Sequence, residues 1–211
     1  MLEAVLFDFD GTLCDSEDAW FRVLQREHIR LRLQFDSEAY NAAIGLPADT
    51  FDAFSALAVE TDEAVCSVES RLEQDVVSTL RAAGPSRATR SIIEQAVDAG
   101  LRLAIATNSR ANFVEQVLRG WDLIKYFEVV VGRSEGVPQK PDPAPYLRTL
   151  AALGLPPAAA LAVEDSFAGA QSAIGAGLRC FQLSTTGARH NGAESIRSLD
   201  DSILRAALEE R

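Results

Sequence analysis

Four short polar segments of the sequence combine carboxylates, hydroxyls and one lysine in a pattern that suits chemistry on a phosphoryl group. They are Asp8-Phe9-Asp10-Gly11-Thr12, Thr107-Asn108-Ser109, Lys140-Pro141-Asp142-Pro143 and Glu164-Asp165-Ser166. A carboxylate attacks a phosphoryl group only when cations and hydrogen-bond donors neutralise its anionic oxygens. The reaction therefore needs a metal ion, an ammonium group and donors, and the four segments offer a candidate for each.

The acidic residues of these segments suit both metal binding and proton transfer. Asp8, Asp165 and Glu164 supply the hard oxygen ligands that Mg²⁺ prefers. Asp8 and Asp10 stand two residues apart on one extended segment, and side chains of an extended chain alternate, so both point to the same side. One carboxylate can attack while the other handles protons.

Lys140 is the candidate for the fixed positive charge. The chain has only two lysines, Lys125 and Lys140, among its 20 basic residues. A compact ammonium fits beside a carboxylate and a phosphate where a guanidinium fork is bulkier. Asp142 is interpreted as structural, because a carboxylate near Lys140 can hold the lysine in place.

Hydrogen-bond donors complete the candidate site. The Thr107 hydroxyl and the backbone N–H groups around Phe9, Asp10 and Asn108 can bind phosphoryl oxygens, and Gly11 permits a tight backbone turn.

Each polar segment follows a predicted buried strand. The strands are expected at 3–7, 101–106, 129–131, 160–163 and 178–181, and helical patterns lie between them around 92–97, 113–118, 146–153 and from 166 onward. The tail from Gly187 shows only a helical pattern around 203–208. Strand and helix alternation predicts an α/β fold, a doubly wound, Rossmann-like parallel sheet that gathers ligands at the carboxyl ends of its strands.

A helical module interrupts this alternation near the start of the chain. Between Glu17 and Gly84 the apolar residues follow helical spacing alone, and Gly84-Pro85 ends the pattern. We therefore predict a catalytic core of residues 1–15 and 85–211, and an inserted helical domain of residues 16–84.

Composition narrows the expected partners and location. A net charge of −11 over 211 residues disfavours nucleic acid and anionic membranes. Three widely spaced cysteines suggest reduced thiols, and no apolar stretch reaches the roughly 18 residues of a membrane span. We expect a cytoplasmic monomer that binds a small phosphorylated molecule and neither nucleic acid nor a membrane.

In their order and context, the four segments resemble the four motifs of the haloacid dehalogenase superfamily, and the resemblance covers almost the whole chain. The stretches 8–16 and 163–169 resemble the branch that contains phosphoglycolate phosphatases, sugar phosphatases and β-phosphoglucomutases. The helical insert resembles the cap domain of that branch.

The resemblance implies a role for each candidate residue. Asp8 is the expected nucleophile, Asp10 the general acid and base, and Thr107 and Lys140 the contacts to the phosphoryl group. Mg²⁺ is expected on Asp8, Asp165 and the backbone carbonyl of Asp10, with Glu164 either a direct ligand or a support for the ligands. The remaining substrate contacts are expected at Phe9, Gly11, Thr12, Asn108, Ser109 and, in the cap loop, Gly45.

Hydrolysis of a small phosphomonoester is the reaction we predict, with a β-phosphoglucomutase-like mutase as the alternative. The loop Ile44-Gly45-Leu46-Pro47 lacks nearby basic residues of the kind expected in the mutases, which favours a phosphatase. A dehalogenase would have no comparable task for Asp10. The Asp8 and Asp10 pair and the long insert speak against a phosphorylatable receiver. A silent binding module would show no turnover of p-nitrophenyl phosphate.

Overall fold

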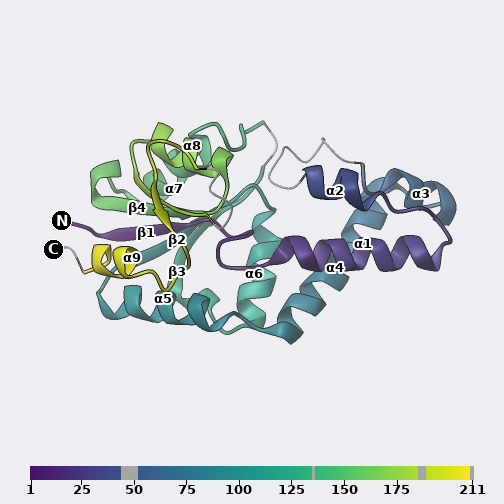
Figure 1. The fold of residues 1–211 in the computed structure, drawn as a ribbon, viewed down its shortest axis with the longest axis horizontal. Coiled ribbons are helices and arrows are strands. Elements are labelled where there is room, and N and C mark those ends of the chain that lie inside the picture. The colour runs from purple at the N-terminus through teal and green to yellow at the C-terminus, as the bar shows by residue number, and fades with distance from the viewer. Residues whose placement is uncertain (44–51, 135, 185–188, 210–211) are drawn as a thin grey trace. The chain divides into compact units, whose positions relative to one another are not determined.

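The computed structural model describes residues 1–43, 52–134, 136–184 and 189–209, and Figure 1 shows its fold. The chain divides into two compact units, Met1–Cys14 with Pro85–Arg211, and Asp15–Gly84. The division falls one residue before the start predicted for the insert. The assignment of the second unit as a cap stays a prediction, and its loop with Gly45 lies outside the described residues.

The first unit is built on a parallel sheet. In the part of the chain that the structure describes, this sheet has six strands in the order β3-β2-β1-β4-β5-β6. The strands are Ala4–Phe7 (β1), Arg102–Ala106 (β2), Phe127–Val131 (β3), Ala160–Glu164 (β4), Arg179–Leu183 (β5) and Glu194–Ile196 (β6). The predicted α/β class with a parallel sheet is confirmed, while β6 was not predicted.

Helices cover both faces of this sheet. They are Arg87–Asp98 (α5), Ala111–Gly120 (α6), Ala144–Leu153 (α7), Phe167–Gly175 (α8) and Ser202–Ala207 (α9), with short 3-10 turns at Ile124–Tyr126 (η1) and Pro157–Ala159 (η2). Figure 1 shows α7 and α8 on one face and α5 on the other. Alanines of β1, β2, β4 and α8 form a tightly packed core with Tyr146 and Leu150 of α7.

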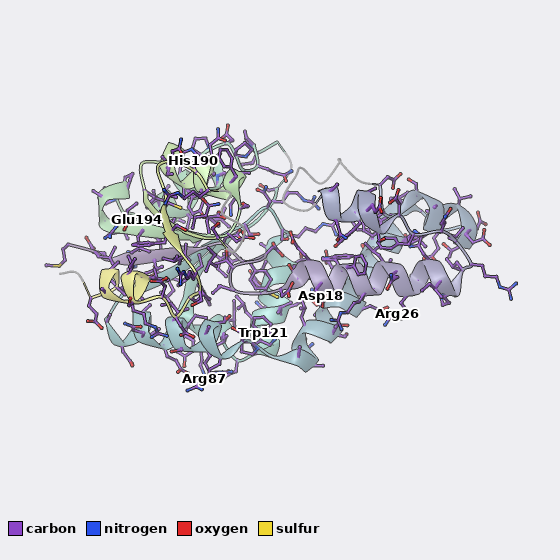
Figure 2. All side chains as sticks on the ribbon, in the orientation of Figure 1. Asp18, Arg26, Arg87, Trp121, His190 and Glu194 are labelled. Atoms are coloured by element: carbon purple, nitrogen blue, oxygen red, sulfur yellow. The ribbon has the colours of Figure 1, made fainter. Side chains whose placement is uncertain are left out.

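The central strand β1 carries Asp8 to the edge where ligands bind. Its residues are buried on both faces, and it lies between β2 and β4 in parallel register. The ladder continues one residue further, because the Asp8 N–H donates to the Val163 carbonyl at 2.9 Å. Beyond it, the Phe9 ring packs against Phe113 and Trp121, which is labelled in Figure 2. Asp8 therefore sits on a rigid, anchored segment.

The second unit contains helices Ser16–Arg30 (α1), Ser37–Ala43 (α2), Ser55–Thr61 (α3) and Val65–Ala83 (α4). Helices α1 and α4 pack along each other and bury Val23, Leu24, Leu72 and Val76. No described helix in either unit is both long and apolar enough to cross a membrane.

Glu27 is a buried charge that ties the helices of this unit together. Its carboxylate accepts two hydrogen bonds from Arg30, both at 2.8 Å, and one from Arg71 of α4 at 2.9 Å. Arg71 also bonds Glu63. The hydrogen bonds from Arg30, together with the one from Arg71, lower the pKa of Glu27 from 4.5 to about 2. The ionised form therefore stabilises the folded unit.

We expect Glu27→Gln to lower the free energy of unfolding of this unit by about 1 to 2 kcal/mol at pH 7, because the charge-assisted hydrogen bonds are lost. Since the folded pKa lies below the ordinary value, this stabilisation is present above pH 4.5 and is lost as the pH falls towards 2. The gap between wild type and variant should shrink between pH 5 and pH 3. Hydrogen exchange of the α1 and α4 amides measures it, with the exposed Glu60→Gln as control; a gap independent of pH would contradict the argument.

Candidate active site

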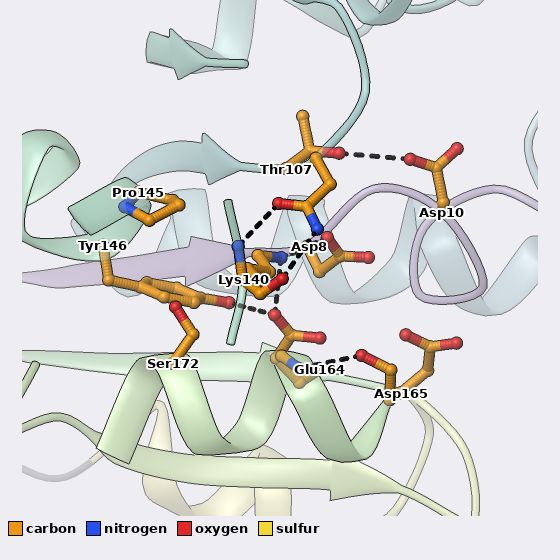
Figure 3. A network of polar contacts seen from close by, with 12 residues as sticks. Asp8, Asp10, Thr107, Lys140, Pro145, Tyr146, Glu164, Asp165 and Ser172 are labelled. Atoms are coloured by element: carbon orange, nitrogen blue, oxygen red, sulfur yellow. Dashed lines mark hydrogen bonds and ion pairs between the residues drawn. The ribbon is translucent and has the colours of Figure 1, made fainter. Parts of the chain in front are cut away.

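Lys140 joins two carboxylates in the interior of the first unit. Its Nζ lies 2.5 Å from Oδ1 of Asp8 and 2.6 Å from Oε1 of Glu164, and all three side chains are buried (Figure 3). Burial would lower the pKa of Lys140, but the charges of Asp8 and Glu164 outweigh it and raise the pKa. The ammonium group therefore stays charged at the position that chemistry on Asp8 requires.

The surroundings of Asp8 carry more negative than positive charge. Burial raises the pKa of Asp8 well above its usual range, Lys140 opposes this, and the carboxylates of Glu164, Asp165 and Asp10 add to it. A further cation would shift the balance towards the ionised carboxylate, which is the form that attacks or binds metal.

Three carboxylates form a candidate metal centre. Oxygens of Asp8, Glu164 and Asp165 lie within 4.8 Å of one another. Oε2 of Glu164 is buried, and within the described ranges it accepts no hydrogen bond. An orphaned carboxylate oxygen in the interior is costly unless a donor or cation satisfies it. The hard oxygen ligands and the orphaned atom fit Mg²⁺. The Asp10 carboxylate is not part of this group, and its predicted carbonyl contact stays a prediction.

Two glycines let the backbone approach these carboxylates closely. Gly11 has φ +73°, and a Cβ there would lie 2.0 Å from Oδ2 of Asp165. A Cβ on Gly169 would lie 1.9 Å from Oε2 of Glu164. Larger residues at either position would displace the acidic side chains, so both positions require glycine.

Two hydroxyls hold the Asp10 carboxylate. Its Oδ2 accepts hydrogen bonds from Thr107 Oγ1 at 3.1 Å and Ser109 Oγ at 2.7 Å. The Ser109 N–H in turn donates to Thr107 Oγ1 at 3.0 Å. In this structure the Thr107 hydroxyl, expected on the phosphoryl group, orients Asp10.

The other predicted substrate contacts, Asn108, Gly11 and Thr12, each have different surroundings. Asn108 brackets the Lys140 backbone, since its Oδ1 accepts from Lys140 N at 2.9 Å and its Nδ2 donates to Lys140 O at 3.3 Å. The Gly11 N–H donates to the Cys14 carbonyl at 2.7 Å. Thr12 is buried, and its hydroxyl has no partner among the described residues.

Asp142 has the structural role predicted for it, but through contacts to α7 and α8 instead of to the Lys140 ammonium. Oδ1 of Asp142 accepts from the Ala144 N–H at the start of α7, and its carbonyl accepts from Ser172 Oγ of α8. Asp142 therefore fixes the loop after Lys140, while the ammonium is held by Asp8 and Glu164.

Two buried polar residues near the site were not found from the sequence. The Tyr146 hydroxyl donates to Oε1 of Glu164 at 2.6 Å, and Gln182 Nε2 donates to the Asp165 carbonyl at 3.3 Å. Both are fully buried. Each stands in an apolar pattern that marks it as core, so the only signal in the sequence is a polar tip at a buried position.

The sequence was compared with protein families and with known proteins. A family model described as haloacid dehalogenase-like hydrolase matches residues 5–183. Among curated proteins, the phosphorylated carbohydrates phosphatase of Thermotoga maritima is 29% identical over 180 residues, covering 84% of this chain and 82% of that protein. Protein CbbY of Rhodobacter capsulatus is 32% identical over 189 residues, covering 84% of this chain and 83% of CbbY.

Solved structures show the same fold. A crystal structure of CbbY from Rhodobacter sphaeroides in complex with phosphate matches with a TM-score of 0.78 and 28% sequence identity. The match covers 94% of this chain and 95% of that one.

We expect Gly11→Ala to weaken Mg²⁺ binding roughly tenfold or more, because the new Cβ displaces Asp165. Gly100→Ala is the matched control: Gly100 has φ +77°, but a Cβ there meets no described atom within 4 Å. Both variants carry left-handed strain of about 1 kcal/mol. A titration that follows the Mg²⁺-dependent rise in Tm separates them, and equal Mg²⁺ affinity in the two variants would refute the role given to Gly11.

Proposed function

The chain belongs to the haloacid dehalogenase-like hydrolase family, on its phosphatase branch, and we propose that it hydrolyses a small phosphomonoester through an aspartyl-phosphate at Asp8 with Mg²⁺ as cofactor. The observation that carries the proposal is the 2.5 Å contact between Lys140 Nζ and Asp8, beside the carboxylates of Glu164 and Asp165. A candidate nucleophile, a fixed ammonium and candidate metal ligands thereby lie close together, with Asp8, Lys140 and Glu164 buried and Asp165 half-buried.

Asp8, Glu164 and Asp165 would hold the metal ion. When bound, Mg²⁺ supplies positive charge that offsets the phosphoryl oxygens and the surrounding carboxylates. Lys140 adds a fixed positive charge, because its raised pKa keeps the ammonium group protonated. Neutralisation of this kind lets one anion attack another.

In the first step the Asp8 carboxylate attacks phosphorus, and the bond from phosphorus to the leaving oxygen breaks. Asp10 gives its proton to that oxygen, held in place by the Thr107 and Ser109 hydroxyls. In the second step Asp10 takes a proton from water as the water attacks phosphorus. The acyl-phosphate bond breaks, and Asp8 and inorganic phosphate are released.

A phosphorylated carbohydrate is the substrate class that we propose. The support is the relative named phosphorylated carbohydrates phosphatase, which aligns with most of this chain. A phosphoglycolate-type substrate also fits the same core chemistry. The sequence features that favour hydrolysis over a mutase reaction lie at 44–47, outside the described residues, so a sugar 1-phosphate assay decides: release of phosphate favours the phosphatase, and a sugar 6-phosphate product favours the mutase.

We expect Asp8→Asn to abolish turnover of p-nitrophenyl phosphate while the fold is retained. An amide is nearly isosteric with the carboxylate but neither attacks phosphorus nor carries the charge that binds Mg²⁺. Rates are measured with Mg²⁺ and after chelation, with the exposed Asp98→Asn as control for the loss of one charge. A folded Asp8→Asn protein with near-normal kcat would overturn the proposed function.

Asp10→Asn should harm the first step in a way that depends on the leaving group. An alkyl phosphate releases a strongly basic alkoxide that needs the proton, whereas p-nitrophenolate leaves readily without it. We expect phosphorylation of Asp8 to slow by roughly 100- to 10,000-fold for the alkyl ester and far less for the aryl ester. Single-turnover kinetics tests this, and equal slowing for the two esters would rule out Asp10 as the acid.

A further inference from the structure

The two oxygens of the Glu164 carboxylate have different surroundings. Oε1 accepts a hydrogen bond from Lys140 Nζ and another from the Tyr146 hydroxyl, both at 2.6 Å. Oε2 is buried and, in the described part of the chain, bonds to nothing. Figure 3 shows the bonded oxygen facing Lys140 and Tyr146 and the other oxygen on the side of Asp165. Oε1 is thus occupied by two hydrogen-bond donors, whereas Oε2 is left for another partner.

Tyr146 contacts both Glu164 and Lys140. It lies on α7, directly after the Lys140 loop, and is fully buried. Burial, followed by the charge of Glu164, raises the pKa of the Tyr146 hydroxyl well above its usual range, so the hydroxyl keeps its proton and donates. Its ring also lies beneath the Lys140 ammonium, 5.2 Å from ring centroid to Nζ.

The Glu164 carboxylate has little space around it, so its hydrogen-bond donors matter for its orientation. The carboxylate rests against the backbone of Gly169, where even a methyl group would overlap it. Of the two donors to Oε1 named above, only Lys140 would remain without the Tyr146 hydroxyl. Lys140 also donates to Asp8. The carboxylate would then be held by a group whose other partner is the nucleophile.

We propose that Tyr146 is a positioning residue for the metal centre. By donating to Oε1 it fixes the rotation of Glu164, reserves Oε2 for the metal ion, and leaves Lys140 on Asp8. This inference deepens the proposed function and rests on it for the identity of the metal. Outer hydrogen-bond partners of metal ligands typically contribute a factor of 10 to 100 in metal affinity.

Tyr146→Phe tests the hydroxyl alone, because the ring, its packing with Leu150 and its contact with Lys140 are retained. We expect the dissociation constant for Mg²⁺ to rise roughly 10-fold or more. The Mg²⁺ concentration that gives half the maximal rate of p-nitrophenyl phosphate hydrolysis should rise by a similar factor. Mg²⁺ affinity is measured without substrate, by calorimetry and by the Mg²⁺-dependent rise in Tm.

Tyr126→Phe is the matched control. Its ring lies 5.3 Å from the Lys125 ammonium, so the same substitution is made beside a lysine of η1 and outside the group of Asp8, Glu164 and Asp165. We expect its Mg²⁺ affinity to equal that of wild type. A Tyr146→Phe protein with unchanged Mg²⁺ affinity would overturn the inference, even if its Tm without metal were lower.

The two proposals fail separately. A wild type that binds Mg²⁺, and loses affinity on Tyr146→Phe, but hydrolyses no phosphomonoester would contradict the proposed function and support the role of Tyr146. If wild type hydrolyses the phosphomonoester and Tyr146→Phe needs the same Mg²⁺ concentration, the proposed function is supported and the role of Tyr146 is contradicted.

Discussion

A buried ammonium between two buried carboxylates is stable only where the partners cannot move away, because an unpaired charge in the interior costs several kcal/mol. Lys140 meets Asp8 and Glu164 under this constraint. The parallel register of β1 and β4 places Phe7 opposite Val163, so the residues that follow, Asp8 and Glu164, arrive side by side at the end of the sheet. The position of the carboxylates is therefore a property of the sheet.

Lys140 itself comes from no strand, so its loop needs other anchors. The Asn108 side chain holds the Lys140 backbone from both sides, and Asp142 connects the loop to the first turn of α7 and to α8. These anchors belong to segments after β2 and β3 and to α8, which are far apart in the sequence. They hold the loop whose lysine contacts Asp8.

The parts of the structure that follow from local pattern were predictable from the sequence. Four consecutive apolar residues before Asp8 indicate a buried strand, and Lys140 stood out because lysine is rare in this chain. Strand β6 lacked such a signal, since Glu194-Ser195-Ile196 is short and mostly polar. Hydrogen-bond partners were not predictable either: Thr107 bonds Asp10 across 97 residues, and Tyr146 reads as an ordinary core position of a helix. Partner choice depends on distances between separate strands, which residue spacing does not encode.

Asp8 and Asp10 show how surroundings differentiate identical side chains two residues apart. Asp8 is buried against Lys140 and two further carboxylates, an environment in which ionisation depends on a neighbouring cation. Asp10 is half-buried, and its carboxylate accepts hydrogen bonds from two hydroxyls, which orient it. A nucleophile must keep one charge state at the moment of attack, whereas an acid and base must change its own, so the proposed division of roles matches the two environments. Directly after Asp10, the positive φ of Gly11 and its close approach to Asp165 leave no room for a side chain at this turn.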